Sequence, residues 1–385
     1  MVDQCNFNHL NLMSIAITIR KNQIKSTFWL IFVSFLLFFI GFLPDFVEKC
    51  YSIGFYPLLG NWLRLLTGWV PFSIGDLLYL GFGVCLIVFL KKGIGKIYKE
   101  KVTLNLIIYL LGNGIRFFCW IYILFKLFWG MNYSRLGIEQ QLGIQKYHYT
   151  KEDITSLTNL LINQTNVLRR SFADNSLPIY SLDLLKLEAV KSYQIANSKH
   201  PFLNYQNLSV KESLYTPLAN YIGFTGYYNP FSGEAQIRTD VPNVLTPYIT
   251  CHEMAHQLGY ASESEANFVG YLAASNSDNS YFKYSVYLDL LGYALSQQFI
   301  LYARDSSFTA FKEIVKYNKN NIDTLVKKDR KEIRHFFMMS RNSIAPISAD
   351  LFDQYLKMNK QLAGINSYDE VLGWLIAYQK KYKKL

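Results

Sequence analysis

The sequence predicts a mainly α-helical protein in which N-terminal transmembrane helices are followed by a mostly helical domain with a small β-hairpin. Three observations lead to this fold class. Long apolar runs fill the first 130 residues, amphipathic patterns of helical spacing fill most of the rest, and one aromatic, β-branched stretch surrounds a Pro-Gly turn. A hydrophobic content of 51% is also rich for a water-soluble chain. We therefore expect a membrane domain over residues 1–130 and a second domain over residues 131–385.

Three apolar runs have the length that crosses the hydrocarbon core of a bilayer, which takes about 20 helical residues. They cover about residues 26–43, 71–90 and 104–129. Buried helices of a soluble protein are the alternative for all three. A cleaved signal peptide is a separate alternative for the first run, but its Phe-Ile-Gly-Phe-Leu-Pro end has no small-residue cleavage site, so we expect a retained anchor.

Basic residues orient these spans, because cytoplasmic loops carry an excess of lysine and arginine. They precede the first span and crowd the loop between the second and third (Arg20, Lys21, Lys25, Lys91, Lys92, Lys96, Lys99 and Lys101). The N-terminus is thus expected in the cytoplasm, and everything after Trp129 outside it. Residues 1–130 hold 12 Lys and Arg against 5 Asp and Glu, so much of the net charge of +11 suits contact with a lipid bilayer. The sequence shows no nucleic-acid-binding module, so we expect no nucleic acid among the partners.

Residues within and between the spans lead to two further predictions. Arg116, near the middle of the third span, is expected to reach toward Asp76 at the outer end of the second, as a pair that fixes helix packing or serves a function. The segment over residues 55–69 is expected to lie along the membrane interface, with Trp62 and Trp69 at headgroup depth.

The second domain reads as helices separated by short connections. Thr150 is a helix cap followed by acidic residues, which predicts a helix to about Phe172. Further helical patterns cover residues 181–198, 280–303, 309–317, 349–362 and 367–385. The exception is residues 223–240, where two short runs flank Asn-Pro-Phe-Ser-Gly and predict a β-hairpin. Five scattered cysteines suggest neither a disulfide framework nor a thiolate metal site.

The motif His252-Glu253-x-x-His256 directly follows this hairpin, inside a predicted helix. Thr246 and Pro247 form a helix start and Gly259 a helix stop. Residues four apart project from one helix face, so both imidazoles can reach a single zinc ion at about 2.0–2.1 Å. Glu253 is placed beside them, as the general base for a zinc-bound water. Two incidental surface histidines are the alternative.

A third protein ligand is needed, and Ser262, Glu263 and Glu265 are the candidates. A serine hydroxyl is a poor zinc ligand, which removes Ser262. Ser262 and Glu265 have the spacing of a capping box, which would occupy Glu265 with a structural role. Glu263 is then the favoured ligand, Glu265 the alternative, and Asn267 one turn further on a supporting partner.

The stretch "HEMAH…ESEAN" resembles the gluzincin metallopeptidases, whose third ligand is the glutamate of an ExxxD motif. Glu263 fits that register, with Asn267 in place of the aspartate. More of the chain resembles an uncharacterised bacterial membrane-protein family, domain of unknown function 3810. The resemblance lies in "FWGMNYSRLG", "GYYNPFSGEAQ", "CHEMAHQLGYASESEANF" and "YLKMNKQLAGINSYDEVLGWLIAY". It implies a membrane-anchored, zinc-peptidase-like protein. Together with the three spans and their basic flanks, this predicts a multi-pass protein of the bacterial cytoplasmic (inner) membrane with an extracytoplasmic, zincin-like domain.

The expected function is hydrolysis of peptide bonds in a peptide or protein of the cell envelope, with Zn²⁺ as cofactor and Glu253 accepting the proton of the attacking water. The hairpin either presents an edge strand to an extended peptide or merely covers the catalytic helix. Candidates for stabilising the oxyanion are Tyr227, Tyr228, Arg238 and His335. The alternatives are a membrane-anchored binding or scaffold protein with a structural or inactive metal site, and a transporter component.

Overall fold

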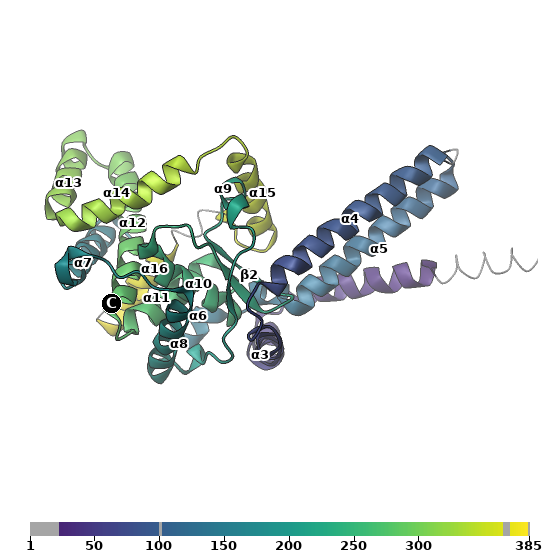
Figure 1. Cartoon of the computed structure of the whole chain (residues 1–385), viewed down its shortest axis with the longest axis horizontal. Coiled ribbons are helices and arrows are strands. Elements are labelled where there is room, and N and C mark those ends of the chain that lie inside the picture. The colour runs from purple at the N-terminus through teal and green to yellow at the C-terminus, as the bar shows by residue number, and fades with distance from the viewer. Residues whose placement is uncertain (1–22, 100–101, 365–369, 384–385) are drawn as a thin grey trace, which may run out of the picture.

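Three long helices project from a helical domain (Figure 1). The computed structural model describes residues 23–99, 102–364 and 370–383. Each of the projecting helices, Gln23–Ile40, α4 (Ile74–Lys99) and α5 (Leu104–Phe128), is long and apolar enough to cross a membrane. The three expected apolar helices are therefore confirmed, and they suggest membrane association. Arg20, Lys21 and Lys101, which contribute to the expected orientation, lie outside the described residues.

A short helical segment connects the first projecting helix to α4. It comprises α2 (Pro44–Phe46), the π-helix η1 (Val47–Phe55) and α3 (Tyr56–Thr67). Figure 1 shows α3 end-on, across the direction of α4 and α5. The face of α3 that contacts the domain includes Arg64, which donates from Nη1 to the carbonyl of Gln257 at 2.9 Å.

The expected pair between Arg116 and Asp76 does not form. Arg116 donates to Thr27 Oγ1 at 3.0 Å, whereas Asp76 accepts from the backbone N–H of Leu214 at 2.7 Å and from the hydroxyl of Tyr227. The prediction was wrong because a carboxylate at the first turn of α4 is in reach of the domain, and the domain offers it donors that the membrane segment does not. Asp76 therefore fixes the start of α4 to the hairpin.

The domain is built mainly from helices, as predicted. Thr150 caps α7 in a capping box with Asp153, and α7 ends at Arg170. The pattern missed the helix Thr324–Met339 and began the helix Ala345–Met358 four residues late. Residues 367–369 and 384–385 of the expected last helix lie outside the described residues. The observed α-helices are α6 (Gly137–Leu142), α7 (Lys151–Arg170), α8 (Leu182–Lys199), α9 (Ala219–Ile222), α10 (Thr246–Gln257), α11 (Glu263–Asn276), α12 (Ser280–Asp305), α13 (Phe308–Asn321), α14 (Thr324–Met339), α15 (Ala345–Met358) and α16 (Val371–Tyr382).

Short 3₁₀ helices connect these elements: η2 (Gly130–Ser134), η3 (Ala173–Asn175), η4 (Pro201–Leu203), η5 (Thr216–Leu218) and η6 (Asn243–Leu245). The predicted hairpin is confirmed as β2 (Gly226–Asn229) and β3 (Glu234–Ile237), which pair antiparallel with Tyr227 opposite Gln236. A third strand, β1 (Val210–Glu212), pairs parallel with β3, giving the order β1-β3-β2. The sequence pattern missed β1 because three residues carry too little alternation to recognise.

The centre of the domain consists of α10 and α11, which are buried along almost their whole lengths. They pack on each other, on α8 and α12, and α10 also packs on β3. The two helices approach closely because α11 carries Gly270, where a Cβ atom would lie only 3.1 Å from the backbone nitrogen of His252. Polar side chains within such a core need partners or a function.

Candidate metal centre

The helix α10 places His252 and His256 on one face, one turn apart. It begins at Thr246, with Pro247 in its first turn, so the N-cap residue is Leu245 and not Thr246 as expected. The Thr246 hydroxyl makes no cap and donates to the carbonyl of Asn243. The helix ends at Gln257, and Gly259 turns the chain with a φ of +88°. This left-handed conformation suits glycine, and a Cβ there would meet the Tyr56 ring at 2.9 Å.

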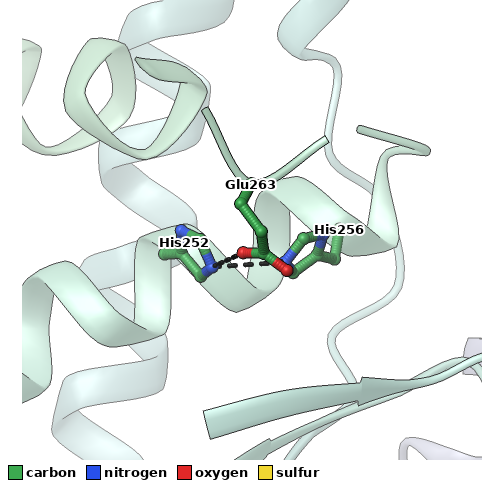
Figure 2. A group of neighbouring side chains, drawn as sticks. All are labelled: His252, His256 and Glu263. Atoms are coloured by element: carbon green, nitrogen blue, oxygen red, sulfur yellow. Dashed lines mark hydrogen bonds and ion pairs between the residues drawn. The ribbon is translucent and has the colours of Figure 1, made fainter. Parts of the chain in front are cut away.

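The turn returns the chain so that Glu263, the first residue of α11, faces both imidazoles (Figure 2). The two Nε2 atoms are 3.2 Å apart, and Glu263 Oε2 lies 3.4 Å from that of His252 and 3.6 Å from that of His256. Two ligand atoms at about 2.0–2.1 Å from a zinc ion with tetrahedral geometry are about 3.3–3.4 Å apart. The three side chains thus form one face of a tetrahedron of the size that zinc requires.

The electrostatics of this group favour a cation. Burial by itself would raise the pKa of the Glu263 carboxyl, but the imidazoles of His256 and His252 lower that pKa well below its usual range. Burial by itself would lower the pKa of the His256 imidazole. The Glu263 carboxylate outweighs burial, so this pKa rises to about 9. The Glu263 carboxylate and the two imidazoles stabilise each other's charged forms, and a metal ion can replace the imidazole protons beside that carboxylate.

Neighbouring groups orient the His256 ring. Its Nδ1 atom lies 2.7 Å from the carbonyl oxygen of Tyr260, which fixes the tautomer that leaves Nε2 free to bind a metal. The Trp129 indole packs edge-on against the same ring, with centroids 6.0 Å apart. Cys251, although adjacent to His252, is part of the hydrophobic core.

Glu253 lies on the adjoining face of α10, against strand β2. Burial raises the pKa of its carboxyl to about 7, partly offset by His252 and His256. Its Oε2 atom has no hydrogen-bond partner among the described residues. A Cβ atom at Gly226 of β2 would lie only 2.6 Å from Glu253 Oε1, so a larger residue there would displace the Glu253 carboxyl. The result is a buried carboxyl that is about half ionised at pH 7 and whose Oε2 has no hydrogen-bond partner among the described residues.

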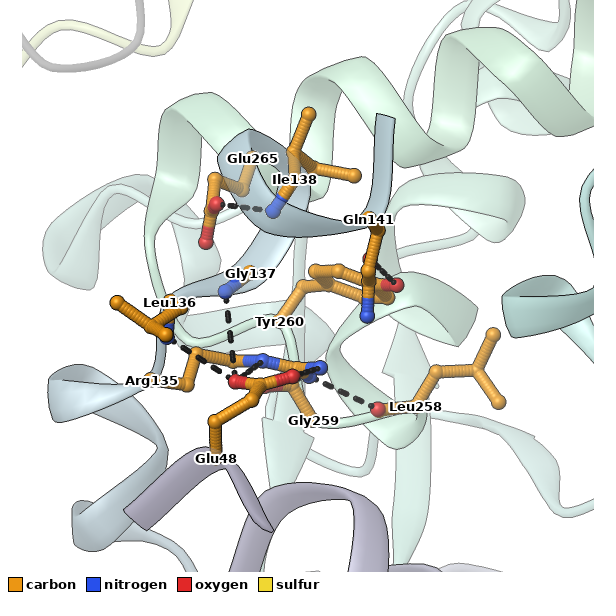
Figure 3. A network of polar contacts seen from close by, with 10 residues as sticks. All are labelled: Glu48, Arg135, Leu136, Gly137, Ile138, Gln141, Leu258, Gly259, Tyr260 and Glu265. Atoms are coloured by element: carbon orange, nitrogen blue, oxygen red, sulfur yellow. Dashed lines mark hydrogen bonds and ion pairs between the residues drawn. The ribbon is translucent and has the colours of Figure 1, made fainter. Parts of the chain in front are cut away.

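Glu265 points away from the two histidines. Its Oε1 accepts from the backbone N–H of Ile138 at 2.8 Å, at the start of α6 (Figure 3). The expected capping box is therefore wrong: Ser262 makes no side-chain cap, and its hydroxyl contacts that of Ser264 at 3.1 Å. The capping box does not form because Glu265 is buried and its carboxylate accepts from the start of α6 instead of from the Ser262 backbone.

A buried ion pair fixes the turn between α10 and α11 (Figure 3). Arg135 donates from Nη2 to Glu48 Oε1 at 2.9 Å and from Nη1 to the carbonyl of Gly259 at 3.0 Å. Glu48 also accepts from the backbone N–H of Leu136 at 3.0 Å. The segment next to the first apolar helix thereby holds the turn that sets the position of Glu263, a connection that no sequence pattern indicated.

A cavity of about 1050 Å³ adjoins the three side chains and Glu253. Asn267 lines it, but its Oδ1 accepts from the Tyr248 hydroxyl at 3.2 Å, and no bond to Glu263 is formed. Tyr227 and Tyr228 also line it, with hydroxyls bonded to Asp76 and Tyr56 respectively.

Of the four expected oxyanion candidates, Arg238 and His335 are absent from the described lining of the cavity. Arg238 instead pairs with Asp240. The cavity wall also holds Tyr133 and Tyr355, whose hydroxyls are 3.1 Å apart. Asp289 lines it too, and burial raises the pKa of its carboxyl to about 6. No motif marks these residues, because they approach from helices distant in the sequence.

The family model described as "Protein of unknown function (DUF3810)" matches residues 51–376. The chain belongs to this family. The match includes α4, α5, the sheet and both helices of the candidate metal centre. No curated protein and no solved structure matches the chain.

Proposed function

We propose that this DUF3810 protein is a membrane-anchored zinc metallopeptidase of the gluzincin type. The observation that carries the proposal is the triangle of 3.2, 3.4 and 3.6 Å formed by His252, His256 and Glu263. Two imidazoles and one carboxylate are the ligand set of a catalytic zinc site, which keeps its fourth position open. Glu263 Oε2, buried without a hydrogen-bond partner among the described residues, fits this role.

A zinc ion bound by these three residues would supply Lewis acidity, polarising the scissile carbonyl and lowering the pKa of water. Side chains of the protein would transfer the proton and donate hydrogen bonds to the substrate. Glu253 is unengaged and has a pKa near 7, so it can accept a proton from water and deliver it to the leaving amine. The Tyr133 and Tyr355 hydroxyls, which lie on the cavity wall, are the donors that we propose for a carbonyl oxygen bound there.

Strand β2 can align an extended peptide. It is an edge strand, paired with β3 on one side and with no other described strand. Gly226, Tyr227 and Tyr228 line the cavity, and Gly226 adjoins Glu253. A peptide added to this edge would lie with its backbone parallel to β2, beside the carboxyl that transfers the proton.

A binding or scaffold protein with a structural metal is the second candidate. Structural zinc sites usually have four protein ligands, whereas the group among the described residues offers three. A large adjoining cavity and an unengaged Glu253 favour catalysis. We further propose a multi-pass protein of the bacterial inner membrane with the N-terminus in the cytoplasm, which follows from the basic residues around the spans and places the metal centre outside the cytoplasm.

The test uses the full chain in lipid nanodiscs. Zinc content is measured by mass spectrometry of the metal, and hydrolysis with a mixture of quenched fluorescent octapeptides. We expect one zinc per chain, cleavage by the wild type, and a Glu253→Gln variant that keeps zinc and loses cleavage. A wild type without stoichiometric zinc, or a Glu253→Gln variant that cleaves as fast as wild type, would refute the proposal.

A further inference from the structure

The two faces that α3 and α15 turn outward are apolar. On α3 they carry Leu58, Trp62 and Leu65, spaced four and three apart, and Trp69 lies just beyond the helix. Residues at such spacing share one helix face. Against the domain, α3 buries Tyr56, Leu63, Arg64 and Thr67, but it leaves the apolar face with Leu58, Trp62 and Leu65 exposed. A second apolar face that the domain does not cover suits a helix lying in a membrane interface.

The α15 stripe, which we define as Ile347, Leu351, Tyr355 and Met358, has the same property. The spacing of four, four and three places these residues on one face, and Ile347 is 62% and Met358 85% exposed. Charged residues occupy the opposite face, where Lys357 pairs with Asp353 at 2.6 Å. Interfacial helices bury such a stripe in the boundary between headgroups and acyl chains.

The C-terminal end of α15 is fixed to the ends of the apolar helices. Just beyond it, Lys360 donates to Ser134 Oγ at 2.9 Å and to the carbonyl of Gly41, which directly follows the helix Gln23–Ile40. The Tyr355 ring packs on Phe125 in the last turn of α5, with centroids 6.3 Å apart. Figure 1 shows α3 and α15 on the side of the domain from which α4 and α5 leave. A bilayer that surrounds the three helices must therefore meet both apolar faces.

The cavity of the metal centre lies against this same side. Its lining includes Tyr79 in the second turn of α4, and Leu351, Phe352 and Tyr355 of α15. Leu351 and Tyr355 belong both to the α15 stripe and to the cavity wall, so the cavity reaches the same face of α15 that is expected to meet lipid. At the other side, Arg64 of α3 binds the carbonyl of Gln257, the residue after His256.

We propose that the metal centre takes its substrate at the membrane surface, and that this substrate is a polypeptide already held in the bilayer by a transmembrane or lipid anchor. The apolar faces of α3 and α15 rest in the interface and set the height of the cavity above the lipid. This inference rests on the proposed peptidase function for the nature of the reaction, but the lipid contact of α15 is independent of it. A soluble peptide would reach the same site only from the aqueous side, without the concentration that confinement to a surface provides.

The first test locates α15. The photoreactive residue p-benzoylphenylalanine replaces Ile347 or Met358 in the full chain, in nanodiscs of phosphatidylethanolamine and phosphatidylglycerol. Matched controls carry it at Phe308 of α13 or Val167 of α7, which are 69% and 57% exposed. We expect lipid adducts at the α15 positions and none at the controls. Adducts to a second copy of the chain, or no more lipid adducts than at the controls, would overturn the inference.

The second test compares one octapeptide mixture in two forms, free and attached to a palmitoyl chain in the same nanodiscs. At equal bulk concentration we expect the anchored form to be cleaved about 100-fold faster, because surface confinement raises its effective concentration. Met358→Glu should reduce cleavage of the anchored form alone and leave zinc content unchanged, whereas Val167→Glu should change neither form. Equal cleavage of both forms by the wild type would refute the substrate class.

The two proposals fail differently. If the zinc-loaded protein cleaves neither form while α15 still crosslinks to lipid, the peptidase function is refuted and the substrate class with it, but the membrane contact stands. If cleavage occurs and α15 crosslinks no lipid, the peptidase stands and the membrane-surface inference is refuted.

Discussion

Glu263 and Glu265 offer a direct test of the metal centre, because they are two residues apart on α11 and are 7% and 9% exposed. The same substitution, Glu→Gln, can be made at each. Glu263→Gln replaces a carboxylate oxygen that lies 3.4 and 3.6 Å from the two imidazole nitrogens. Glu265→Gln keeps an oxygen that can still accept from the N–H of Ile138.

The expected loss of zinc affinity follows from the position of each oxygen. Removing partners that only support a ligand typically lowers metal affinity 10- to 100-fold, so loss of a direct ligand should lower it by about 100-fold or more. This corresponds to about 2.7 kcal/mol or more of binding free energy. Glu265 contacts α6 and shares no partner with the two histidines, so we expect its substitution to change the zinc dissociation constant by less than about threefold.

The assay is competition for zinc against a chromophoric chelator, performed on full-length protein in nanodiscs. Folding of each variant is checked by its thermal unfolding midpoint, because Glu265→Gln removes a buried charge close to Arg135. The result that would refute the reasoning is the reverse order: zinc retained in Glu263→Gln and lost from a folded Glu265→Gln protein. Glu265 would then be the ligand, contrary to the geometry.

Three further results are expected. Gly226→Ala should keep zinc but lower kcat by about 100-fold, because the added Cβ displaces the Glu253 carboxyl, and unchanged turnover would contradict the role of Glu253. Arg135→Met should lower the free energy of unfolding, measured by denaturant titration, by about 3–5 kcal/mol, because it leaves Glu48 charged, buried and unpaired. The control Lys146→Met breaks a partly exposed pair with Glu370 and should lower the same free energy by less than about 1 kcal/mol. Chelation of zinc should lower the thermal midpoint of the wild type and not that of Glu263→Gln; equal shifts in both would show that the chelator acts elsewhere.

Local patterns in the sequence were sufficient wherever neighbours along the chain decide the structure. The three apolar helices, the capping box of Thr150, the hairpin around the Pro-Gly turn and the one-turn spacing of His252 and His256 were all predicted from such patterns. Each depends on interactions within a few residues, or on hydrophobic length alone. The site prediction therefore named the three side chains that the structure brings together.

The predictions that failed concern partners that are distant in the sequence. Asp76 accepts from Tyr227 and Leu214 instead of meeting Arg116, and Glu265 accepts from Ile138 instead of closing a capping box. Strand β1 has only three residues, too few for a local pattern, and its parallel partner follows 25 residues later, as Val210 pairs with Ala235. A polar group in a core bonds to whichever donor the packing places beside it, and one sequence does not state which that is.

The sequence by itself determined that two imidazoles share a helix face and that three apolar helices precede them, because periodicity and length are local properties. Only the tertiary structure decided which glutamate faces the imidazoles. The turn at Gly259, held by Arg135 and Glu48, brings Glu263 to them and directs Glu265 toward α6. The tertiary structure also placed the cavity between Tyr79 of α4 and the stripe of α15, beside the candidate metal centre. The physical reason is that side-chain direction within a buried core is fixed by packing against distant elements.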